Sequence, residues 1–378
     1  MRVAIDARAL SHPQRGGFKT YVEGLLPVLV ASSPHRFTWY TDRLLAEEGR
    51  APNLTIIAVP GSFPVIGMPF REQARLPQRL RMDKPDLAHF PCNTAPILCP
   101  VPNVITVHDL FQLDAWKRCS SGTQSLWQRS IAFYSAVALR RAIHRASMVI
   151  TVSAAVRRQI VKHLHLAEDR VAVTYQAARP IFTADGPISP LPAGLRPGFI
   201  LGIGSADPRK NMPGLLRSYR LLPGRLRKRV PLVIVCTHPS VGPMVSSHAT
   251  RLGISPILLT SVDDELLARL YRAAGVFAFP SLAEGFGLPP LEAMASGTPV
   301  VVTDSTSLPE VIADAGLLVC RSDEAAFAGA LQSVLEDRNL HDQLARRGRE
   351  RASTFTWARC AKETIAVYEQ AISRQGNL

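Results

Sequence analysis

The chain has 378 residues, enough for two domains that each bury a core, and its formal net charge is +14. Its six cysteines are scattered, with no CxxC pair and no histidine cluster at metal-ligand spacing, so we expect a reduced protein without a metal site. No uncharged apolar stretch approaches the roughly 18 residues of a membrane span, and MRVAIDARAL lacks the apolar core of a secretory signal. We therefore expect a cytoplasmic protein.

The charge is unevenly distributed along the chain. Residues 1–180 contain 23 Lys and Arg against 12 Asp and Glu, a balance of +11, whereas the remainder contains 21 against 18, a balance of +3. The excess favours an anionic partner for the first half, whether lipid headgroups, nucleic acid or a phosphorylated substrate. An ordinary basic surface that aids solubility explains it equally well.

The first half alternates short β-branched segments with amphipathic ones. The predicted strands are VAIDA, FTWYT, LTIIAV, DLAHF, NVITVHD, SMVITVS and RVAVTY. Helices are predicted from about Phe18 and after each of NVITVHD and SMVITVS, a rhythm typical of a parallel sheet covered by helices on both faces. Residues 181–197 are rich in proline and glycine and have neither periodicity, so we predict an interdomain linker there.

The same rhythm restarts after the linker. The predicted strands are FILGIG, PLVIVCT, PILLT, GVFAFPS and PVVVTD, with helices between them and from there to the end. The predicted domains are residues 1–180 and 198–355, followed by a C-terminal helix over 356–378 that can return to the first domain. Because ligands bind beyond the carboxyl ends of the strands in such sheets, function should lie on the loops after the strands.

One of these loops, AEGFGLPPLEA at residues 283–293, follows the strand GVFAFPS. Its glycines let backbone N–H groups approach a ligand, and the helix that starts at the prolines adds positive partial charge, so the loop suits phosphate and polyhydroxyl groups. Glu284 and Glu292 can accept hydrogen bonds from sugar hydroxyls. Taken alone, Glu292 has the plainer interpretation of a dipole-compensating glutamate in an opening helical turn, and Glu284 that of a solvated loop residue.

Two further loops follow first strands. Arg209 and Lys210 come after FILGIG, where cations can meet the charge of a diphosphate or simply flank a surface helix. Gly16 and Gly17 follow the first strand of the chain, where backbone amides can face an anion or form a simple turn.

His108 and Ser153 end two other predicted strands. The histidine can be a satisfied structural residue, and the serine can be only the N-cap of the next helix. Gly202 and Gly204 begin a pattern that resembles a dinucleotide fingerprint, but Asp207 stands where the third glycine is needed. An oxidoreductase is therefore not expected.

Together these segments resemble a known family. AEGFGLPPLEAMASGTPVVVTD, with two glutamates separated by seven residues, is similar to the signature of the retaining nucleotide-sugar glycosyltransferases of family 4. That family has the GT-B fold, two Rossmann-like parallel-sheet α/β domains that face each other across a cleft. ILGIGSADPRKNMPGLLRSY, VITVHDL, MVITVSAAVRRQI and RGGFKTYVEGLL also match the family, so the resemblance runs from Arg15 to Asp304.

The resemblance implies roles for individual residues. Glu284 would hold the sugar hydroxyls, Glu292 the ribose, and Lys210 with Arg209 the diphosphate. His108 would contact the donor sugar. Many members carry a further arginine about where this chain has Gly204, so the diphosphate would depend more on Arg209 here. The implied catalytic group is Glu284, His108, Lys210 and Arg209, and the implied nucleotide-sugar site is Gly16, Gly17, Ser153, Gly204, Arg209, Lys210, Gly285, Phe286, Gly287, Leu288 and Glu292.

The implied activity is a retaining hexosyl transfer that needs neither metal nor cofactor. The donor, a nucleotide-diphosphate sugar, would bind mainly to the second domain, and a glycan or lipid-diphosphate-linked saccharide acceptor mainly to the first, in cell-surface polysaccharide synthesis. The HDLF and DPRKN forms are most similar to bacterial members that use GDP-mannose, so mannose is favoured. The alternatives are a UDP-sugar-dependent transferase of the same fold and a GT-B sugar-nucleotide epimerase. TYQAARPIF replaces an Asn-Gly-Val-Asp turn that many relatives carry before the linker.

Two basic stretches suggest a membrane surface. Arg71, Arg75 and Arg79 follow the apolar loop FPVIGMPF at i, i+4 and i+8, a pattern that suits anionic lipid, and residues 129–162 contain seven Arg and Lys without an acid. We predict peripheral attachment to the inner face of the cytoplasmic membrane. Nucleic acid is not expected as a partner, because the chain has no cluster of aromatic residues interleaved with the basic ones and no recognisable binding motif. The apolar stripe of the long helix, predicted to face the core, is Trp127, Ile131, Tyr134 and Ala138.

Overall fold

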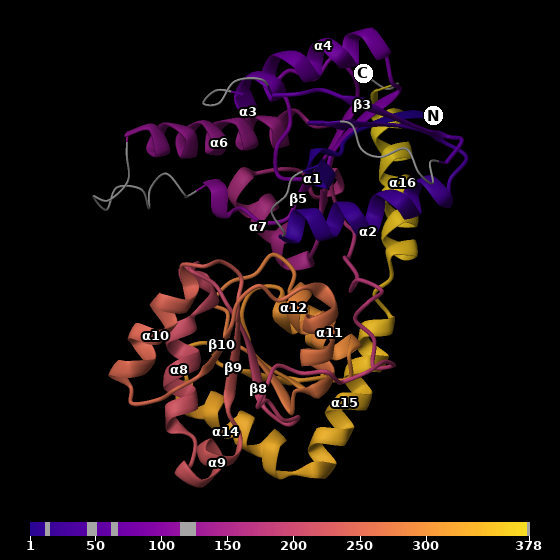
Figure 1. Ribbon diagram of the computed structural model, residues 1–378. Helices are drawn as coiled ribbons and strands as arrows, with labels where there is room; N and C mark the ends of the chain where they lie inside the picture. Colours follow the sequence, from indigo (N-terminus) through magenta and orange to yellow (C-terminus); the bar gives the residue numbers. More distant parts are fainter. Residues whose placement is uncertain (12–15, 44–50, 62–66, 114–125, 376–378) are drawn as a thin grey trace. The chain divides into compact units, whose positions relative to one another are not determined.

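The computed structural model describes residues 1–11, 16–43, 51–61, 67–113 and 126–375 (Figure 1). The chain forms two compact units, Met1–Gln176 together with Trp357–Leu378, and Ala177–Thr356. The segment predicted as a linker, 181–197, belongs to the second unit. Arg272 holds it there by donating hydrogen bonds to the carbonyl oxygens of Thr183 and Pro187, at 3.0 and 2.9 Å.

The first unit is built on a seven-stranded parallel sheet with the strand order β3-β2-β1-β4-β5-β6-β7. Its strands are β1 (Arg2–Asp6), β2 (Arg36–Thr41), β3 (Leu54–Ala58), β4 (Leu87–Phe90), β5 (Asn103–Val107), β6 (Met148–Thr151) and β7 (Val171–Val173). Its described helices are α1 (Arg8–Ser11), α2 (Gly17–Ala31), α3 (Gly67–Phe70), a π-helical turn (Arg71–Arg75), α4 (Leu76–Asp83), α6 (Leu126–Arg145), α7 (Ala154–Leu164), a 3₁₀ turn (Glu168–Arg170) and α16 (Trp357–Gln375). Every strand predicted for this half of the chain is present.

The C-terminal helix α16 completes the core of the first unit. It packs on α2 so closely that a Cβ atom at Gly24 would lie 2.1 Å from the Trp357 ring. Further along α16, the Tyr368 hydroxyl lies 2.7 Å from His89 Nδ1, and His89 Nε2 lies 2.8 Å from Thr106 Oγ1. Figure 1 shows α16, in yellow, running beside α2.

The second unit repeats the architecture with a six-stranded parallel sheet of order β10-β9-β8-β11-β12-β13. Its strands are β8 (Ile200–Gly204), β9 (Leu232–Cys236), β10 (Ile257–Leu259), β11 (Val276–Phe279), β12 (Val300–Thr303) and β13 (Leu317–Val319). Its helices are a 3₁₀ turn (Pro208–Lys210), α8 (Met212–Leu221), α9 (Gly224–Arg229), α10 (Val241–Arg251), α11 (Asp264–Ala273), α12 (Leu288–Ala295), α13 (Leu308–Ile312), α14 (Glu324–Glu336) and α15 (Arg338–Ser353). The prediction missed β13, a three-residue edge strand too short to show a period.

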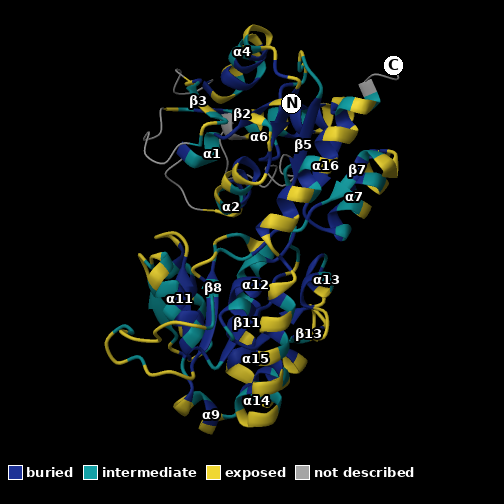
Figure 2. Ribbon diagram, turned by 90° about the vertical axis from the view of Figure 1, so that its right-hand side faces the viewer, coloured by how far each residue is buried: buried dark blue, intermediate teal, exposed yellow. Residues whose placement is uncertain are grey.

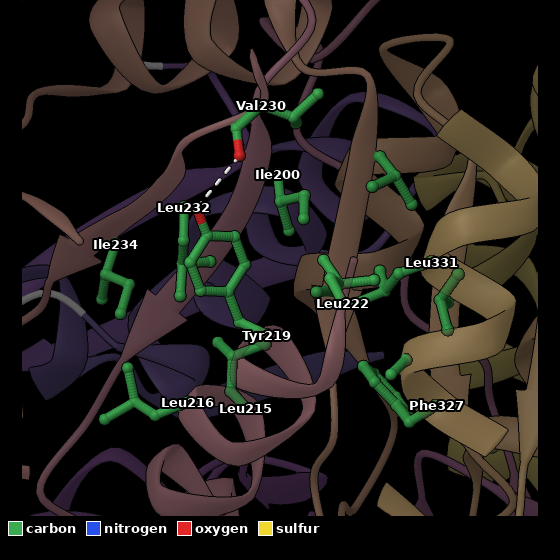
Figure 3. Packing of buried hydrophobic residues seen from close by; sticks show 14 of the residues in the cluster. Ile200, Leu215, Leu216, Tyr219, Leu222, Val230, Leu232, Ile234, Phe327 and Leu331 are labelled. Carbon is green, nitrogen blue, oxygen red and sulfur yellow. Dashed lines mark hydrogen bonds between the residues drawn. The ribbon is translucent and has the colours of Figure 1, made fainter. Parts of the chain in front are cut away.

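Continuous apolar strands explain why this second sheet is covered on both faces. All four residues of β11 are buried, and Figure 2 shows β11 in dark blue behind α14 and α15, whose outer faces are exposed. Leu215 and Phe327, from α8 and α14, enter the same apolar cluster (Figure 3). The buried Tyr219 hydroxyl donates a hydrogen bond to the Val230 carbonyl oxygen at 3.1 Å, so the apolar cluster holds no unpaired phenol.

Each sheet has one place where the strand order reverses. In the first unit this is the boundary between β1 and β4, and in the second the boundary between β8 and β11. Loops that leave neighbouring strands on opposite sides of such a boundary diverge and leave room for a ligand. The residues that follow β8 and β11 therefore lie where a ligand is expected.

Candidate functional site

Lys210 and Glu284 meet at this boundary of the second unit. The Lys210 ammonium donates a hydrogen bond to Glu284 Oε1 at 2.7 Å, and the Ser281 hydroxyl donates to the same oxygen at 2.6 Å. Lys210 also lies over the Phe279 ring, 5.1 Å from its centroid. The two side chains are 26% and 11% exposed, so the pair is partly shielded from water but open on one side.

Hydroxyl groups after the next strand, β12, fix the backbone of this loop. Thr306 Oγ1 accepts a hydrogen bond from the Glu284 N–H and donates one to the Glu284 carbonyl oxygen, both at 2.8 Å. Ser307 donates to the carbonyl oxygen of Phe286, also at 2.8 Å. The sequence analysis missed both residues, although STS directly follows PVVVTD, which was already predicted as a strand.

The glycine before α12 is conformationally required. Gly287 has a φ of 117°, and a Cβ there would lie 2.7 Å from Leu308 Cδ2. Leu288 is then the first residue of α12, and Phe286 is buried edge-on against the Phe355 ring. Phe286 and Gly287 are buried, whereas Gly285 and Leu288 are partly exposed. An anion site at this loop stays a prediction.

Arg209 is held within its own turn. Its guanidinium donates to Asp207, with Nε 2.9 Å from Oδ2 and a second contact through Nη2. Burial alone would raise the pKa of Asp207, but hydrogen bonds from Arg209 lower it overall. Gly204 ends β8, and a Cβ there would lie 2.8 Å from Ile234 Cγ2, so this packing leaves no room for the arginine that many relatives carry.

Glu292 lies on α12 and is buried. Its Oε1 lies 3.4 Å from Arg179 Nε, and Arg179 Nη1 donates to Asp264 at 2.6 Å. Burial raises the pKa of Glu292 to about 7, against the opposing effect of Arg179. Sequence reasoning found Glu292 but missed Arg179, which stands within the TYQAARPIF segment that departs from the family.

His108 in the first unit already uses both of its ring nitrogens. Nε2 lies 2.8 Å from the Pro91 carbonyl oxygen and therefore carries the proton, while Nδ1 accepts from the Gln176 amide at 3.0 Å. Burial lowers the pKa of His108 to about 4, so the ring is neutral near pH 7. A contact with a donor sugar would therefore have to replace one of these partners or use the ring edge.

The other predicted residues of the first unit differ in accessibility. Ser153 is fully buried and caps α7, accepting a hydrogen bond from the Val156 N–H at 3.1 Å. Gly16 and Gly17 are exposed, and a Cβ at either would meet nothing within 4 Å. Arg15, where the family resemblance begins, lies outside the described residues.

A cavity of about 520 Å³ is lined by Asp42 and Pro60, which follow β2 and β3. Its lining also includes apolar side chains of α6, Met68 and Pro69, and the polar side chains Glu72 and Thr94. Burial raises the pKa of Glu72 to about 7, although Arg8 opposes this effect. The predicted core stripe of α6 lines this cavity through Ile131, Tyr134 and Ala138. The side chain of Trp127 lies outside the described residues.

The prediction that Arg71, Arg75 and Arg79 form one lipid-facing surface is wrong for Arg71. Its side chain is fully buried, with Nη2 2.8 Å and Nη1 3.2 Å from the two carboxylate oxygens of Asp6 and Nε 2.9 Å from Asp42. Two carboxylates at the ends of β1 and β2 offset the cost of burying the guanidinium.

The described residues were also compared with the requirements of a membrane-spanning helix and of a metal site. No described helix is long and apolar enough to cross a bilayer. Over the part of the chain that the structure covers, three or more His, Cys, Asp or Glu side chains nowhere gather as a metal site would require.

The sequence matches two family descriptions. Glycosyltransferase Family 4 covers residues 15–178, and Glycosyl transferases group 1 covers residues 190–351. The O-antigen chain mannosyltransferase B of Escherichia coli is 36% identical over 244 residues, 62% of this chain and 64% of that protein. The MMP alpha-(1->4)-mannosyltransferase of Mycolicibacterium hassiacum is 41% identical over 182 residues, 46% of this chain and 44% of that protein. The chain therefore matches less than two thirds of the length of these relatives.

Solved structures agree with the observed architecture. A sucrose-phosphate synthase from Thermosynechococcus elongatus superposes with a TM-score of 0.73 at 20% identity, covering 99% of this chain and 100% of that one. WaaG, a glycosyltransferase involved in lipopolysaccharide biosynthesis, superposes with a TM-score of 0.71 at 17% identity, covering 96% and 98%. Two parallel-sheet domains, both family matches and these superpositions lead to one conclusion: the chain belongs to the family 4 glycosyltransferases and has the GT-B fold.

Proposed function

We propose that this chain transfers mannose, with retention of configuration, from a nucleotide-diphosphate sugar to a saccharide acceptor in cell-surface polysaccharide synthesis. The observation that carries the proposal is the contact between Lys210 and Glu284 at 2.7 Å, where the strand order of the second sheet reverses. A cation suited to a diphosphate and a carboxylate suited to sugar hydroxyls thus lie side by side. The names of the relatives favour mannose, and GDP-mannose is the favoured donor.

The chemistry of the pair fits the breaking of a bond to a diphosphate. Lys210 has three N–H donors, so its ammonium can keep Glu284 and still donate to a phosphate oxygen. The N-terminus of α12 adds positive partial charge beside it. Negative charge grows on the leaving diphosphate, and these fixed groups, with Arg209 released from Asp207, stabilise it without a metal ion. Retention is carried over from the family, in which attack on the same face is assisted by the leaving phosphate.

The acceptor is proposed to bind mainly to the first unit. The cavity of about 520 Å³ offers an apolar wall for the C–H face of a sugar ring and the polar side chains Asp42, Glu72 and Thr94 for its hydroxyls. A glycan or a lipid-diphosphate-linked saccharide fits this combination.

Attachment to the inner face of the cytoplasmic membrane is part of the proposal. On the two helices that contribute to the cavity, Met68 and Phe70 of α3 and Phe133 of α6 are 48%, 39% and 56% exposed. Exposed basic residues on the same helix, Arg129, Arg140 and Arg141, supply attraction to anionic lipid of about 1 kcal/mol per charge. Equal sedimentation of the protein with neutral and with anionic vesicles would refute the attachment.

The experiment that tests the donor is calorimetric titration with GDP and with UDP in the presence of a chelator. We expect GDP to bind at least about tenfold more tightly, a difference of about 1.4 kcal/mol. Labelled GDP-mannose should then pass its sugar to an acceptor extract. Tighter UDP binding would instead favour a UDP-sugar-dependent transferase, and an isomerised sugar without acceptor would favour an epimerase.

A further inference from the structure

Residues 179–187 form a strap across α11 within the second unit. At its start Arg179 donates to Asp264, and the buried Phe182 ring lies edge-on to the Tyr271 ring at 5.5 Å. At its end Arg272 donates to the carbonyl oxygens of Thr183 and Pro187. The strap is thus fixed to one face of α11 at three points.

Arg179 is the residue of the strap that reaches the candidate site. Its guanidinium lies between two carboxylates, 2.6 Å from Asp264 Oδ2 and 3.4 Å from Glu292 Oε1. Its face lies over the Phe182 ring, 4.7 Å from the centroid. The side chain is 20% exposed, whereas that of Glu292 is 7% exposed, so the strap covers the carboxylate from one side.

We propose that Arg179 is a positioning residue for the donor: it holds the Glu292 carboxylate toward the ribose hydroxyls and favours its charged form, and thereby sets the affinity for the nucleotide. This inference rests on the proposed function, in which Glu292 binds the ribose. The inference goes beyond the proposed function because it assigns a role to a residue within the segment that departs from the family.

The physical reason is the burial of Glu292. A carboxylate can accept hydrogen bonds at both oxygens, but a protonated carboxyl loses part of this capacity and cannot serve two vicinal hydroxyls equally well. Burial raises the pKa of Glu292 to about 7, and Arg179 is the main group that lowers it. Without Arg179, Glu292 would be largely protonated at neutral pH.

The other groups that act on Glu292 come from α11. Asp264 raises the pKa of Glu292 by its charge, and the Tyr271 hydroxyl lies beside the carboxylate without a well-aligned hydrogen bond. Where α15 packs on α12, Gly348 lies against the apolar Met294. Arg179 and Asp264 therefore act on Glu292 with opposite signs.

The test is the pH dependence of GDP and UDP binding, measured by calorimetry on the full chain between pH 5.5 and 9. In the wild type, affinity should fall as the pH drops through about 7. In Arg179→Met the midpoint of the change in affinity with pH should move to higher pH. If it reaches about pH 8, the ionised fraction at pH 7 falls from about one half to about one tenth, which weakens binding about fivefold, and binding recovers at pH 9.

Two control variants distinguish an effect on Glu292 from a general loosening of the strap. Asp264→Asn removes the negative charge that raises the pKa of Glu292, so the midpoint of the change in affinity should move to lower pH. Arg272→Met loosens the strap at its other end without touching Glu292, so its midpoint should stay with the wild type. If Arg179→Met fails to fold, a downward shift in Asp264→Asn beside an unchanged midpoint in Arg272→Met still tests whether the charges around Glu292 set that midpoint.

A modified nucleotide separates Glu292 from the phosphate, which itself titrates near pH 6. With 2′,3′-dideoxy-GDP the step near pH 7 should disappear, because no ribose hydroxyl remains to be bound. The inference is overturned if Arg179→Met keeps the wild-type midpoint, if Arg272→Met shifts it equally, or if the dideoxy nucleotide shows the same step. Wild-type protein that binds neither GDP nor UDP would overturn the proposed function as well.

Discussion

The two units present their candidate residues in different ways. In the second unit Lys210 and Glu284 satisfy each other across two loops and remain partly exposed. In the first unit the polar atoms of His108 and Ser153 are taken up by Pro91, Gln176 and the start of α7, and both side chains are buried. A pair of opposite charges can open to a ligand that offers an anion to the lysine and hydroxyl donors to the carboxylate, whereas a histidine bound to a backbone carbonyl must first lose that bond. The charged pair of the second unit is thus accessible to a ligand, whereas the polar atoms of His108 and Ser153 already have partners within the first unit.

The largest effect is expected from a substitution that separates Lys210 and Glu284 in the second unit. Glu284→Gln keeps the size of the side chain and an acceptor for Ser281 but removes the charge that faces Lys210. We expect transfer of labelled mannose from GDP-mannose to fall by about 10² to 10³-fold, the usual cost of losing one stabilising group at a reacting centre.

A matched carboxylate serves as the control for this variant. Glu324 pairs with Arg217 at 2.6 Å on α14 of the same unit. Glu324→Gln should leave the transfer rate unchanged, and both variants should unfold at temperatures close to that of the wild type. Full activity of Glu284→Gln would remove Glu284 from the site.

A smaller effect, on the free energy of unfolding, is expected from substituting one glycine in each unit. Gly287→Ser places a side chain at a φ of 117°, with its Cβ 2.7 Å from Leu308, so we expect a loss of about 1–3 kcal/mol in the free energy of unfolding. Gly16→Ser enters open space before α2, where serine is a good N-cap, so the change should stay within about 0.5 kcal/mol. Denaturant titration of the full chain measures both, and equal losses would contradict the difference between the two loops.

The last expected effect appears only below neutral pH and concerns the buried His108. Its pKa is about 4 in the folded chain and about 6.5 in an unfolded one, so above pH 6.5 it is neutral in both states and costs nothing. As the pH falls below 6.5, the unfolded chain takes up the proton first, and the wild type loses up to about 1.4 kcal/mol per pH unit from this group until about pH 4.

His108→Gln should not show that loss. The glutamine amide can still donate to the Pro91 carbonyl oxygen but does not titrate. Thermal unfolding of both proteins between pH 7 and 4.5 should therefore show a stability difference that narrows as the pH falls. Parallel curves would mean that His108 is protonated in the folded state or does not titrate in this range.

Strands and their order of appearance were predictable because buried parallel strands are continuous apolar segments. Lys210 and Glu284 were both predicted to lie on loops after strands, but their hydrogen bond to each other was not predicted. Arg71 could not be placed, since its partners Asp6 and Asp42 are distant in sequence and the i, i+4, i+8 spacing also suits a surface. Arg179 was missed for a similar reason, because nothing local signals that it reaches Glu292. Sequence periodicity therefore did not predict ion pairs between residues that are distant in sequence.

The position of α16 has a consequence for how the protein is made. This helix supplies Trp357 and Tyr368 to the core of the first unit, yet it is synthesised after the whole second unit. At about 5–20 residues per second, the intervening residues 177–356 take about 10 to 40 s to be translated. During that time the first unit stands on the nascent chain with the α2 surface around Gly24 uncovered. The second unit, continuous in sequence, can fold first, and the first unit reaches its final form only after the last helix has been made.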